Sequence, residues 1–424
     1  MPNNRSTKDF KHLSKGVKNI KKSVKPLFEF PVVNNLNSKL VKFYTFNAGF
    51  KKKLDDLLII VFNKPSPVTA VYSKTSTPSA PIIWDKKNNN GFCKILIVNS
   101  GNANAHTGKD GIKVINDYVK IASKYFNCPI NQILVSSTGV IGEKLDHKGI
   151  VNSFAKIKKS NEKKLLSAAQ AIMTTDTFPK TVLKTININS KKVRIFGIAK
   201  GSGMIFPNMG TMLAYIFIEA NLSKKLLNRL LNDNVEETFN SISVDGDTST
   251  SDTVMLFSLF EKNEKNINKS SDIKKLQKSL RDVMSNLSLQ IVSDGEGISK
   301  LIQIDVQKAI SYKQASAVAF SIANSSLVKT AIAGEDANWG RVIAAIGKAD
   351  SHIIQNKIKL KFGKYLLASN GKKKNNVNTK KIDSYMHNKK INIKVDLGIG
   401  SYSKTVYSSD LTHEYISINA DYRS

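Results

Sequence analysis

The residues around Gly210 and Thr211, where a glycine-rich loop runs into an apolar stretch, are the strongest candidates for covalent chemistry. A threonine hydroxyl is a weak nucleophile unless a base lies beside it. If the Gly210–Thr211 peptide bond broke, the new α-amino group of Thr211, with a pKa of ~7.7–8.0, could be that base. Glycine at 210 tolerates the strained backbone of an N-to-O acyl shift. The pattern predicts a self-cleaving chain, although a plain turn entering a strand has the same pattern.

Two other loops follow predicted strands and could assist this hydroxyl. Residues 99–108 come after a strand at 94–98, and residues 136–145 come after a strand at 133–135. The carboxyl ends of strands are where α/β sheets usually keep their sites. Gly139 has no side chain to keep its backbone N–H away from a reacting oxygen. Loop 99–108 is equally consistent with a tight Asn/Gly turn.

Other known motifs are incomplete in this sequence. The GSG of loop 201–210 has Phe206 where a dinucleotide loop needs its third glycine, and segment 245–256 has Leu256 where a calcium loop needs glutamate. A P-loop lysine, GxSxG and HExxH do not occur, and the histidines have no ligand spacing. Segment 245–256 is therefore interpreted as a hydrogen-bonded turn with one functional acid at most. We expect no bound cofactor and no metal.

Composition argues against several other classes of protein. The 424 residues carry a net charge of +32, but the cations are nearly all lysine, whereas phosphate binding favours arginine. A nucleic-acid-binding protein is therefore the less favoured alternative.

Cys93 and Cys128 lie far apart, and no apolar run approaches the ~20 residues of a membrane span. With no secretory signal after Met1, we expect a cytoplasmic protein. Residues 1–26 are strongly basic and predict a flexible tail.

Hydrophobic patterns alternate between strands and helices in both halves of the chain, which predicts an α/β or α+β protein. The expected strands are 57–62, 80–84, 94–98, 133–135, 192–198, 213–218, 254–260, 290–292, 391–397 and 414–419. The expected helices are 111–126, 153–171, 222–231, 276–287, 315–325 and a last one that ends near 346. Pro65 and Pro67 predict a turn between the first two strands.

From about residue 54 to residue 424 the sequence closely resembles the ornithine acetyltransferase family, the glutamate N-acetyltransferases of arginine biosynthesis. The resemblance lies in long segments that occur in the family's order: VNSGNANAHTG, SSTGVIGEKL, MTTDTFPK, KGSGMIFPNMGTML, SVDGDTSTSDTV, SDGEGISK, SSLVKTAIAGEDANWGR and SDLTHEYISINADYRS. Three positions depart from it, one of which is His106, where a smaller residue is more usual. Gly210 stands where alanine is usual before the nucleophile, and Ser424 stands where threonine is common.

The resemblance implies a layered mixed-sheet fold with outer helices, of the N-terminal-nucleophile kind. Self-cleavage would give two fragments, 1–210 with the oxyanion loops (its globular part 27–210) and 211–424 starting with Thr211. Two copies of each fragment would assemble as a heterotetramer. By ping-pong transfer, Thr211 would take acetyl from N-acetylornithine and give it to glutamate. Acetyl-CoA as a further donor is left open.

The resemblance also implies roles for individual residues. Thr138 and Gly139 would form the oxyanion site, and the substrate pocket would be lined by Thr174, Lys200, Thr211, Glu296, Asn419 and Ser424. Thr175 is an equal candidate to Thr174. Because donor and acceptor are amino acids, a cation such as Lys200 suits a carboxylate and an acid such as Glu296 suits an ammonium group. The alternative within catalysis is an aminopeptidase or amidohydrolase with the same nucleophile and water as acceptor.

Overall fold

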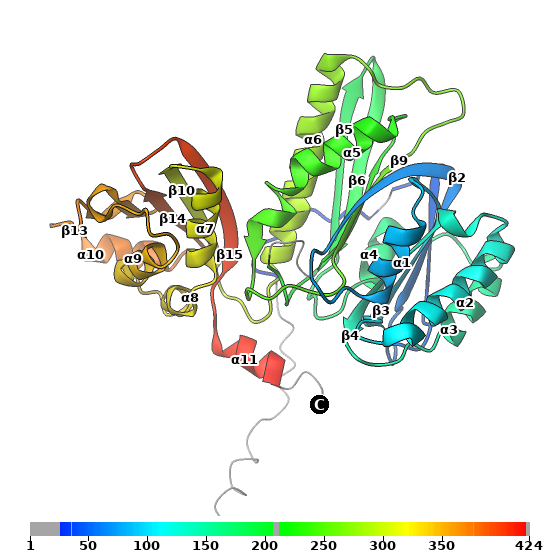
Figure 1. The fold of residues 1–424 in the computed structure, drawn as a ribbon, viewed down its shortest axis with the longest axis horizontal. Coiled ribbons are helices and arrows are strands. Elements are labelled where there is room, and N and C mark those ends of the chain that lie inside the picture. Colours follow the sequence, from blue (N-terminus) through cyan, green and yellow to red (C-terminus); the bar gives the residue numbers. More distant parts are fainter. Residues whose placement is uncertain (1–25, 35, 207–211, 376, 421–424) are drawn as a thin grey trace, which may run out of the picture.

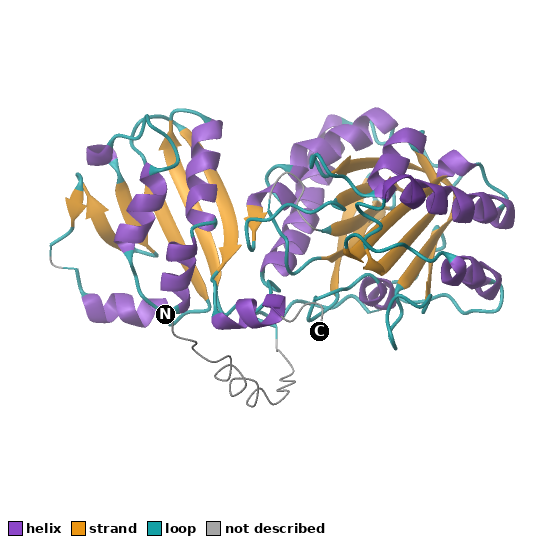
Figure 2. Ribbon diagram, turned by 60° about the horizontal axis from the view of Figure 1, so that its bottom comes forward, coloured by secondary structure: helices purple, strands orange, loops and turns teal. Residues whose placement is uncertain are grey.

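The computed structural model describes residues 26–34, 36–206, 212–375 and 377–420. These residues form two neighbouring lobes, each built on a mixed β-sheet with helices packed against it (Figures 1 and 2). The predicted mixed α/β class is therefore confirmed. The predicted break at Gly210–Thr211 lies outside the described residues, and so does the predicted basic tail apart from its last residue, Pro26.

The first lobe holds a sheet in which the strands run in the order β4-β3-β2-β9-β7-β6-β5, with β1 beside β2. Its strands are β1 (Val41–Phe46), β2 (Leu57–Tyr72), β3 (Phe92–Asn102), β4 (Ile133–Val140), β5 (Lys180–Ile188), β6 (Lys191–Lys200), β7 (Leu213–Ile218) and β9 (Thr253–Ser258). The pairs β3–β4 and β7–β9 are parallel and the others are antiparallel. Every residue of β7 and β9 is buried, as their unbroken apolar pattern predicts for strands covered on both faces.

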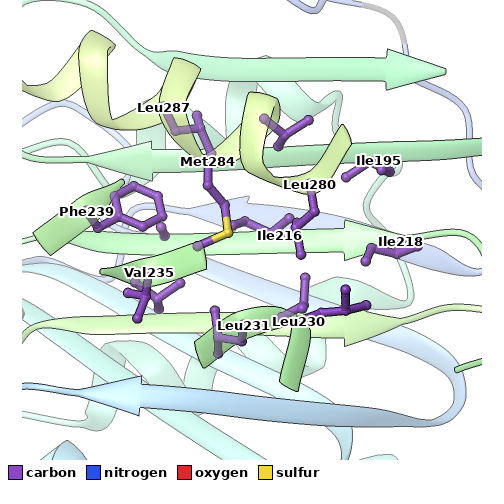
Figure 3. Packing of buried hydrophobic residues seen from close by; sticks show 14 of the residues in the cluster. Ile195, Ile216, Ile218, Leu230, Leu231, Val235, Phe239, Leu280, Met284 and Leu287 are labelled. Atoms are coloured by element: carbon purple, nitrogen blue, oxygen red, sulfur yellow. The ribbon is translucent and has the colours of Figure 1, made fainter. Parts of the chain in front are cut away.

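Helices cover this sheet with apolar residues packed against it. They are α1 (Ala80–Asn88), α2 (Gly108–Phe126), α3 (Lys148–Ile157), α4 (Leu165–Ala171), α5 (Lys224–Val235) and α6 (Ser270–Val292). Helices α1 to α3 pack on β2, β3 and β4, whereas α5 packs on β2 and β9 and α6 packs on β5 and β6. Figure 3 shows Met284 of α6 between Ile216 of β7 and Val235 of α5.

The second lobe holds a sheet in the order β13-β12-β11-β14-β10-β15-β8. Its strands are β8 (Ile242–Ser243), β10 (Leu301–Ala309), β11 (Lys359–Phe362), β12 (Tyr365–Ser369), β13 (Lys372–Lys373), β14 (Lys390–Asp396) and β15 (Tyr402–Ser409). Its helices are α7 (Tyr312–Ala323), α8 (Ser326–Ala333), α9 (Trp339–Gly347) and α10 (Thr379–Met386). Apolar residues of most of these strands and helices form one separate core, whereas Ile242 of β8 belongs to the core of the first lobe. After β15 the chain forms α11 (His413–Ala420), which lies between the lobes (Figure 1).

In the described ranges, no single helix has both the length and the apolar composition to cross a membrane. Helices α7 and α8 would meet that test only as a pair, and they are bent by 53° relative to each other. Most of their apolar residues belong to the core of the second lobe, whereas Leu327 is exposed.

Three predicted strands are helices in the structure. Residues 80–84 belong to α1, where Pro81 in the first turn presets the helical backbone angle. Residues 290–292 form the last turn of α6, and residues 414–419 lie in α11. Short apolar runs do not distinguish a buried strand from a buried helix, so pattern alone misassigned these segments.

Most of the other predicted elements differ from the structure at their ends, and two predictions differ further. The expected helix 153–171 is divided into α3 and α4 by the lysine-rich residues 158–164, which are mostly exposed. The turn expected at Pro65 and Pro67 is instead part of β2, whose pairing with β3 shifts in register between Val61 and Ser66. Proline cannot donate a hydrogen bond to a regular strand pairing. It is tolerated at such an irregularity, where that hydrogen bond is not required.

Candidate active site

A pocket of about 380 Å³ lies where the ends of β4 and β6 approach α11. Six of the predicted site residues line it, although they are spread over most of the chain: Thr138, Gly139, Thr174, Lys200, Glu296 and Asn419. Thr175 lines the pocket beside Thr174, so both candidates stay open. The structure thus brings these predicted residues together, while their individual roles stay predictions.

The other predicted site residues, Gly210, Thr211 and Ser424, lie outside the described residues. The chain resumes at Met212, whose backbone N–H donates to Asp252 Oδ1 at 2.7 Å. Leu213, at the start of β7, pairs with Lys200 at the end of β6. The start of β7 is therefore held next to a residue that lines the pocket.

Lys200 and Thr138 form the buried polar contact at the base of the pocket. The Lys200 Nζ atom donates to Thr138 Oγ1 at 3.0 Å, and only 2% of Lys200 is exposed. Burial lowers the pKa of Lys200, while the charge of Asp176 raises it again in part. Asp176 therefore replaces only part of the stabilisation that the buried Lys200 ammonium group loses with its water. An anion bound in the pocket would stabilise this ammonium group further.

Gly139 has a φ angle of +133°, a backbone conformation that a residue with a side chain could not adopt without strain. A Cβ atom at this position would lie 2.3 Å from the carbonyl carbon of Gly101 on the neighbouring strand β3. Glycine is therefore required at this point by both backbone angle and space. Gly139 also lies in the wall of the pocket.

Glu296 is held by α11 and by a glycine on the opposite side. Asn419 Nδ2 donates to Glu296 Oε2 at 2.9 Å, which ties the last described helix to the pocket. A Cβ atom at Gly203 would lie 2.5 Å from the Glu296 carboxylate, so a side chain there would force Glu296 to move. The position of Glu296 is thus defined from two sides.

A second acidic wall was only partly predicted from the sequence. Asp245 and Asp247 line the pocket together with the hydroxyl-bearing residues of segment 248–251. Asp245 accepts hydrogen bonds from the backbone N–H groups of Met204 and Ile205, at 2.5 and 2.9 Å. Burial raises the pKa of Asp245. The incomplete calcium-loop pattern indicated this segment, but not which of its acids would face the pocket.

Asp252 lies in the same segment and is fully buried. Its Oδ1 atom accepts the Met212 N–H, whereas its Oδ2 atom has no hydrogen-bond partner among the described residues. Burial raises the pKa of Asp252 well above its ordinary value, and the charge of Lys200 opposes this shift. Apart from its place in segment 245–256, no sequence signal singled out this residue.

Comparisons with known proteins identify relatives of this chain. The ArgJ family model matches residues 42–424. The chain is 44% identical to the arginine biosynthesis bifunctional protein ArgJ of Bartonella henselae, over 91% of this chain and 95% of that protein. It is 43% identical to the protein of the same name from Bradyrhizobium diazoefficiens, over the same shares of the two chains. A crystal structure of ArgJ from Bacillus halodurans, 34% identical, covers 50% of this chain and 100% of its own, with a TM-score of 0.46.

Proposed function

This chain belongs to the ArgJ family, and from that premise we propose that it transfers the acetyl group of N-acetylornithine to glutamate. The observation that carries the proposal is that one pocket is lined by six predicted residues from distant parts of the chain. It offers a cation, acids and hydroxyl groups within one small volume, which suits substrates that carry both carboxylate and ammonium groups.

In the proposed reaction the peptide bond between Gly210 and Thr211 is first hydrolysed, and water supplies the oxygen of the new Gly210 carboxylate and the proton of the new Thr211 amine. The freed α-amino group of Thr211 takes the proton of its own hydroxyl, and the oxygen attacks the acetyl carbon of N-acetylornithine. The amide C–N bond then breaks, and the proton passes to the departing nitrogen of ornithine. The amino group of glutamate next attacks the acetyl-Thr211 ester, which releases N-acetylglutamate and restores the hydroxyl.

Thr138 and Gly139 are proposed to stabilise the negative charge that develops on the acetyl oxygen. The contact of Thr138 with Lys200 supports this role, because Lys200 Nζ is the donor in that hydrogen bond. Thr138 Oγ1 acts there as an acceptor, so its own O–H remains available to donate toward the oxyanion. The backbone N–H of Gly139 would be the second donor.

We propose that residues of opposite charge bind the carboxylate and the ammonium group of the substrate. Lys200 would bind a substrate carboxylate and Glu296 a substrate ammonium group, with Asn419 orienting Glu296. Thr174 and Ser424 would complete the pocket. We further propose a cytoplasmic heterotetramer with two copies of each fragment and no resident cofactor, and we leave acetyl-CoA open as a second acetyl donor.

The first test compares the intact mass and the acetyl-transfer activity of the protein with those of Thr211→Ala. We expect two fragments that meet between Gly210 and Thr211, and transfer from N-acetylornithine to glutamate. The variant should stay uncut and lose roughly 1,000-fold or more in activity, on the order of the loss for removing a catalytic nucleophile. An uncut wild-type chain that still transfers acetyl would contradict the free-amine mechanism.

The same assay separates transfer from hydrolysis. With N-acetylornithine alone, an amidohydrolase would release acetate steadily because water is its acceptor. A transferase should instead release about one ornithine per active site and continue only when glutamate is added, as expected for ping-pong chemistry. Steady acetate release that glutamate does not change would favour the hydrolase.

A further inference from the structure

Behind the pocket, Lys180 at the start of β5 is completely buried between two carboxylates. Its Nζ atom lies 2.7 Å from Asp176 Oδ1 and 2.6 Å from Asp294 Oδ2. Both carboxylate side chains are at most 2% exposed. A buried ion cluster of this kind is expensive to desolvate and is weak evidence for a stabilising role, because well-packed apolar residues often stabilise a fold as much or more.

Each carboxylate also fixes a segment that carries a pocket residue. Asp176 accepts from the backbone N–H of Thr174 at 2.9 Å, and from that of Gly201 at 2.7 Å, directly after Lys200. Asp294 lies two residues before Glu296 and accepts from the backbone N–H of Thr177 at 3.0 Å.

A hydrogen bond between uncharged groups also joins the segment after Lys200 to the segment before Glu296. The hydroxyl of Ser202 donates to the backbone carbonyl of Asp294 at 2.6 Å. Ser202 is 2% exposed and, like the three charged residues, is not among the described residues that line the pocket. The segments that carry Thr174, Lys200 and Glu296 are thus joined to one another from behind.

We propose that Asp176, Lys180 and Asp294 form a positioning triad that sets Thr174, Lys200 and Glu296 relative to one another for substrate binding. This inference rests on the proposed function, since it concerns the same pocket. The three residues lie outside the described lining of the pocket, so they act only through the residues that they hold.

The charges of the triad support this role. Although burial alone would raise it, the pKa of Asp176 is lowered by the charges of Lys180 and Lys200. Asp176 is therefore ionised, and its charge in turn favours the charged form of buried Lys200. Within the triad, Asp176 therefore both holds the segment of Lys200 and favours the charged form of Lys200, whereas the charge of Lys180 opposes that form.

Two variants test the triad. Asp176→Asn keeps the shape of the side chain, but its single oxygen cannot accept both from Thr174 and from Gly201 as the two carboxylate oxygens do. Ser202→Ala removes only the neutral contact with Asp294, so it should fold even if the charge change does not. Arg194→Met is the matched control, because it breaks a part-buried ion pair with Glu219 in the same sheet and away from the pocket.

The readouts are KM and kcat for N-acetylornithine and for glutamate, together with the thermal unfolding midpoint. We expect KM for both substrates to rise roughly tenfold in Asp176→Asn and about threefold in Ser202→Ala, as for the loss of a positioning contact. The control should keep both constants within about twofold of wild type, whatever its unfolding midpoint. Unchanged KM and kcat in a folded Asp176→Asn variant would overturn the triad's positioning role. The same result in a folded Ser202→Ala variant would overturn the proposed connection between the segments of Lys200 and Glu296.

Crystal structures of the wild type and the two variants test the positioning role independently of enzyme activity. Displacement of Thr174 or Lys200 relative to Glu296 is expected in the variants, and an unmoved pocket would overturn the inference. If the wild type transfers no acetyl, the proposed function fails while this comparison still decides the inference. The two failures are therefore distinguishable.

Discussion

The burial of the Lys200 side chain makes substrate binding depend on pH. The charged and titratable groups that act on it are Asp176, Lys180, Asp252, Glu296 and Lys51. Because burial lowers the pKa of Lys200, its ammonium group loses its proton at a lower pH than an ordinary lysine does. Carboxylate binding should therefore weaken as pH rises through this lowered pKa.

The prediction is a rise in KM for N-acetylornithine at alkaline pH that begins at lower pH in Asp176→Asn than in the wild type. The variant lacks the negative charge that favours the protonated form of Lys200. Both proteins are measured with the same substrate from about pH 7 to pH 10, so ionisation of the substrate itself cancels. Identical pH profiles would argue against Lys200 as the carboxylate-binding group.

Gly203→Ala should weaken substrate binding with little effect on stability. An alanine Cβ would lie 2.5 Å from the Glu296 carboxylate, so Glu296 must move. We expect a roughly tenfold higher KM, equivalent to about 1.4 kcal/mol of binding free energy. Gly340→Ala on α9 is the control, because its Cβ would meet only Asn338 Oδ1 at 3.6 Å. Equal KM values for wild type and Gly203→Ala would show that Glu296 is not fixed by this contact.

Among the helices and strands, α8 is joined through Lys329 to the acidic segment of the pocket and to β15. The Lys329 Nζ atom donates to the backbone carbonyl of Val244 at 2.7 Å and also contacts the carbonyl of Ser409. Burial lowers its pKa to about 8. Between pH 8 and the ordinary lysine pKa of 10.5, the unfolded chain therefore holds more of this proton than the folded chain does.

It follows that Lys329 makes the folded state more stable as pH rises through this window, by roughly 3 kcal/mol in total. Lys329→Met should lose this part of the pH dependence. The measurement is the unfolding free energy in urea at about pH 7.5, 8.5 and 9.5, with Lys308→Met as a control at an exposed lysine. The same slope in wild type and Lys329→Met would contradict the lowered pKa.

The elements also show what the sequence could and could not predict. Continuous apolar strands such as β7 were predicted with correct bounds, because six buried residues in a row leave little ambiguity. Residues 414–419 were predicted as a strand, yet they form α11, which has no buried residue and is held by contacts such as Asn419 with Glu296. Its conformation depends on tertiary contacts that local pattern does not contain.

The site was predictable to the extent that chemistry lies within short motifs. Family resemblance singled out Lys200, Glu296 and Asn419, and all three line one pocket. Asp176 and Lys180 lie within a quoted motif, but nothing in their local sequence shows that Asp294, more than a hundred residues away, completes their triad. Such a role becomes visible only when the fold brings the three segments together.

In the molecule as a whole, the predicted break falls between two neighbouring strands of one sheet. Strands β7 and β9 come after the Gly210–Thr211 bond, and they lie between β2 and β6, which come before it. Strand β7 pairs with β6 from Leu213 to Ile218, and β9 pairs with β2 from Thr253 to Phe257. The later fragment is therefore inserted between strands of the earlier one within the sheet.

We predict that the two fragments elute together in size-exclusion chromatography and separate only in denaturant. Their contacts include backbone hydrogen bonds and buried apolar side chains, and the Lys180–Asp294 ion pair between them is buried, so about 1 M salt should not release them. Gel electrophoresis of the eluted peak would show both fragments. Two separate peaks in native buffer would contradict this arrangement.

The insertion of β7 and β9 between β2 and β6 also bears on how such a protein can change over evolutionary time. A substitution on β6 is felt directly by its hydrogen-bonded neighbours on β7, although the two strands would belong to different polypeptides in the mature enzyme. Compensating substitutions should therefore arise in pairs across the break. The two halves would be inherited and selected as one unit, and halves exchanged between distant relatives should assemble poorly.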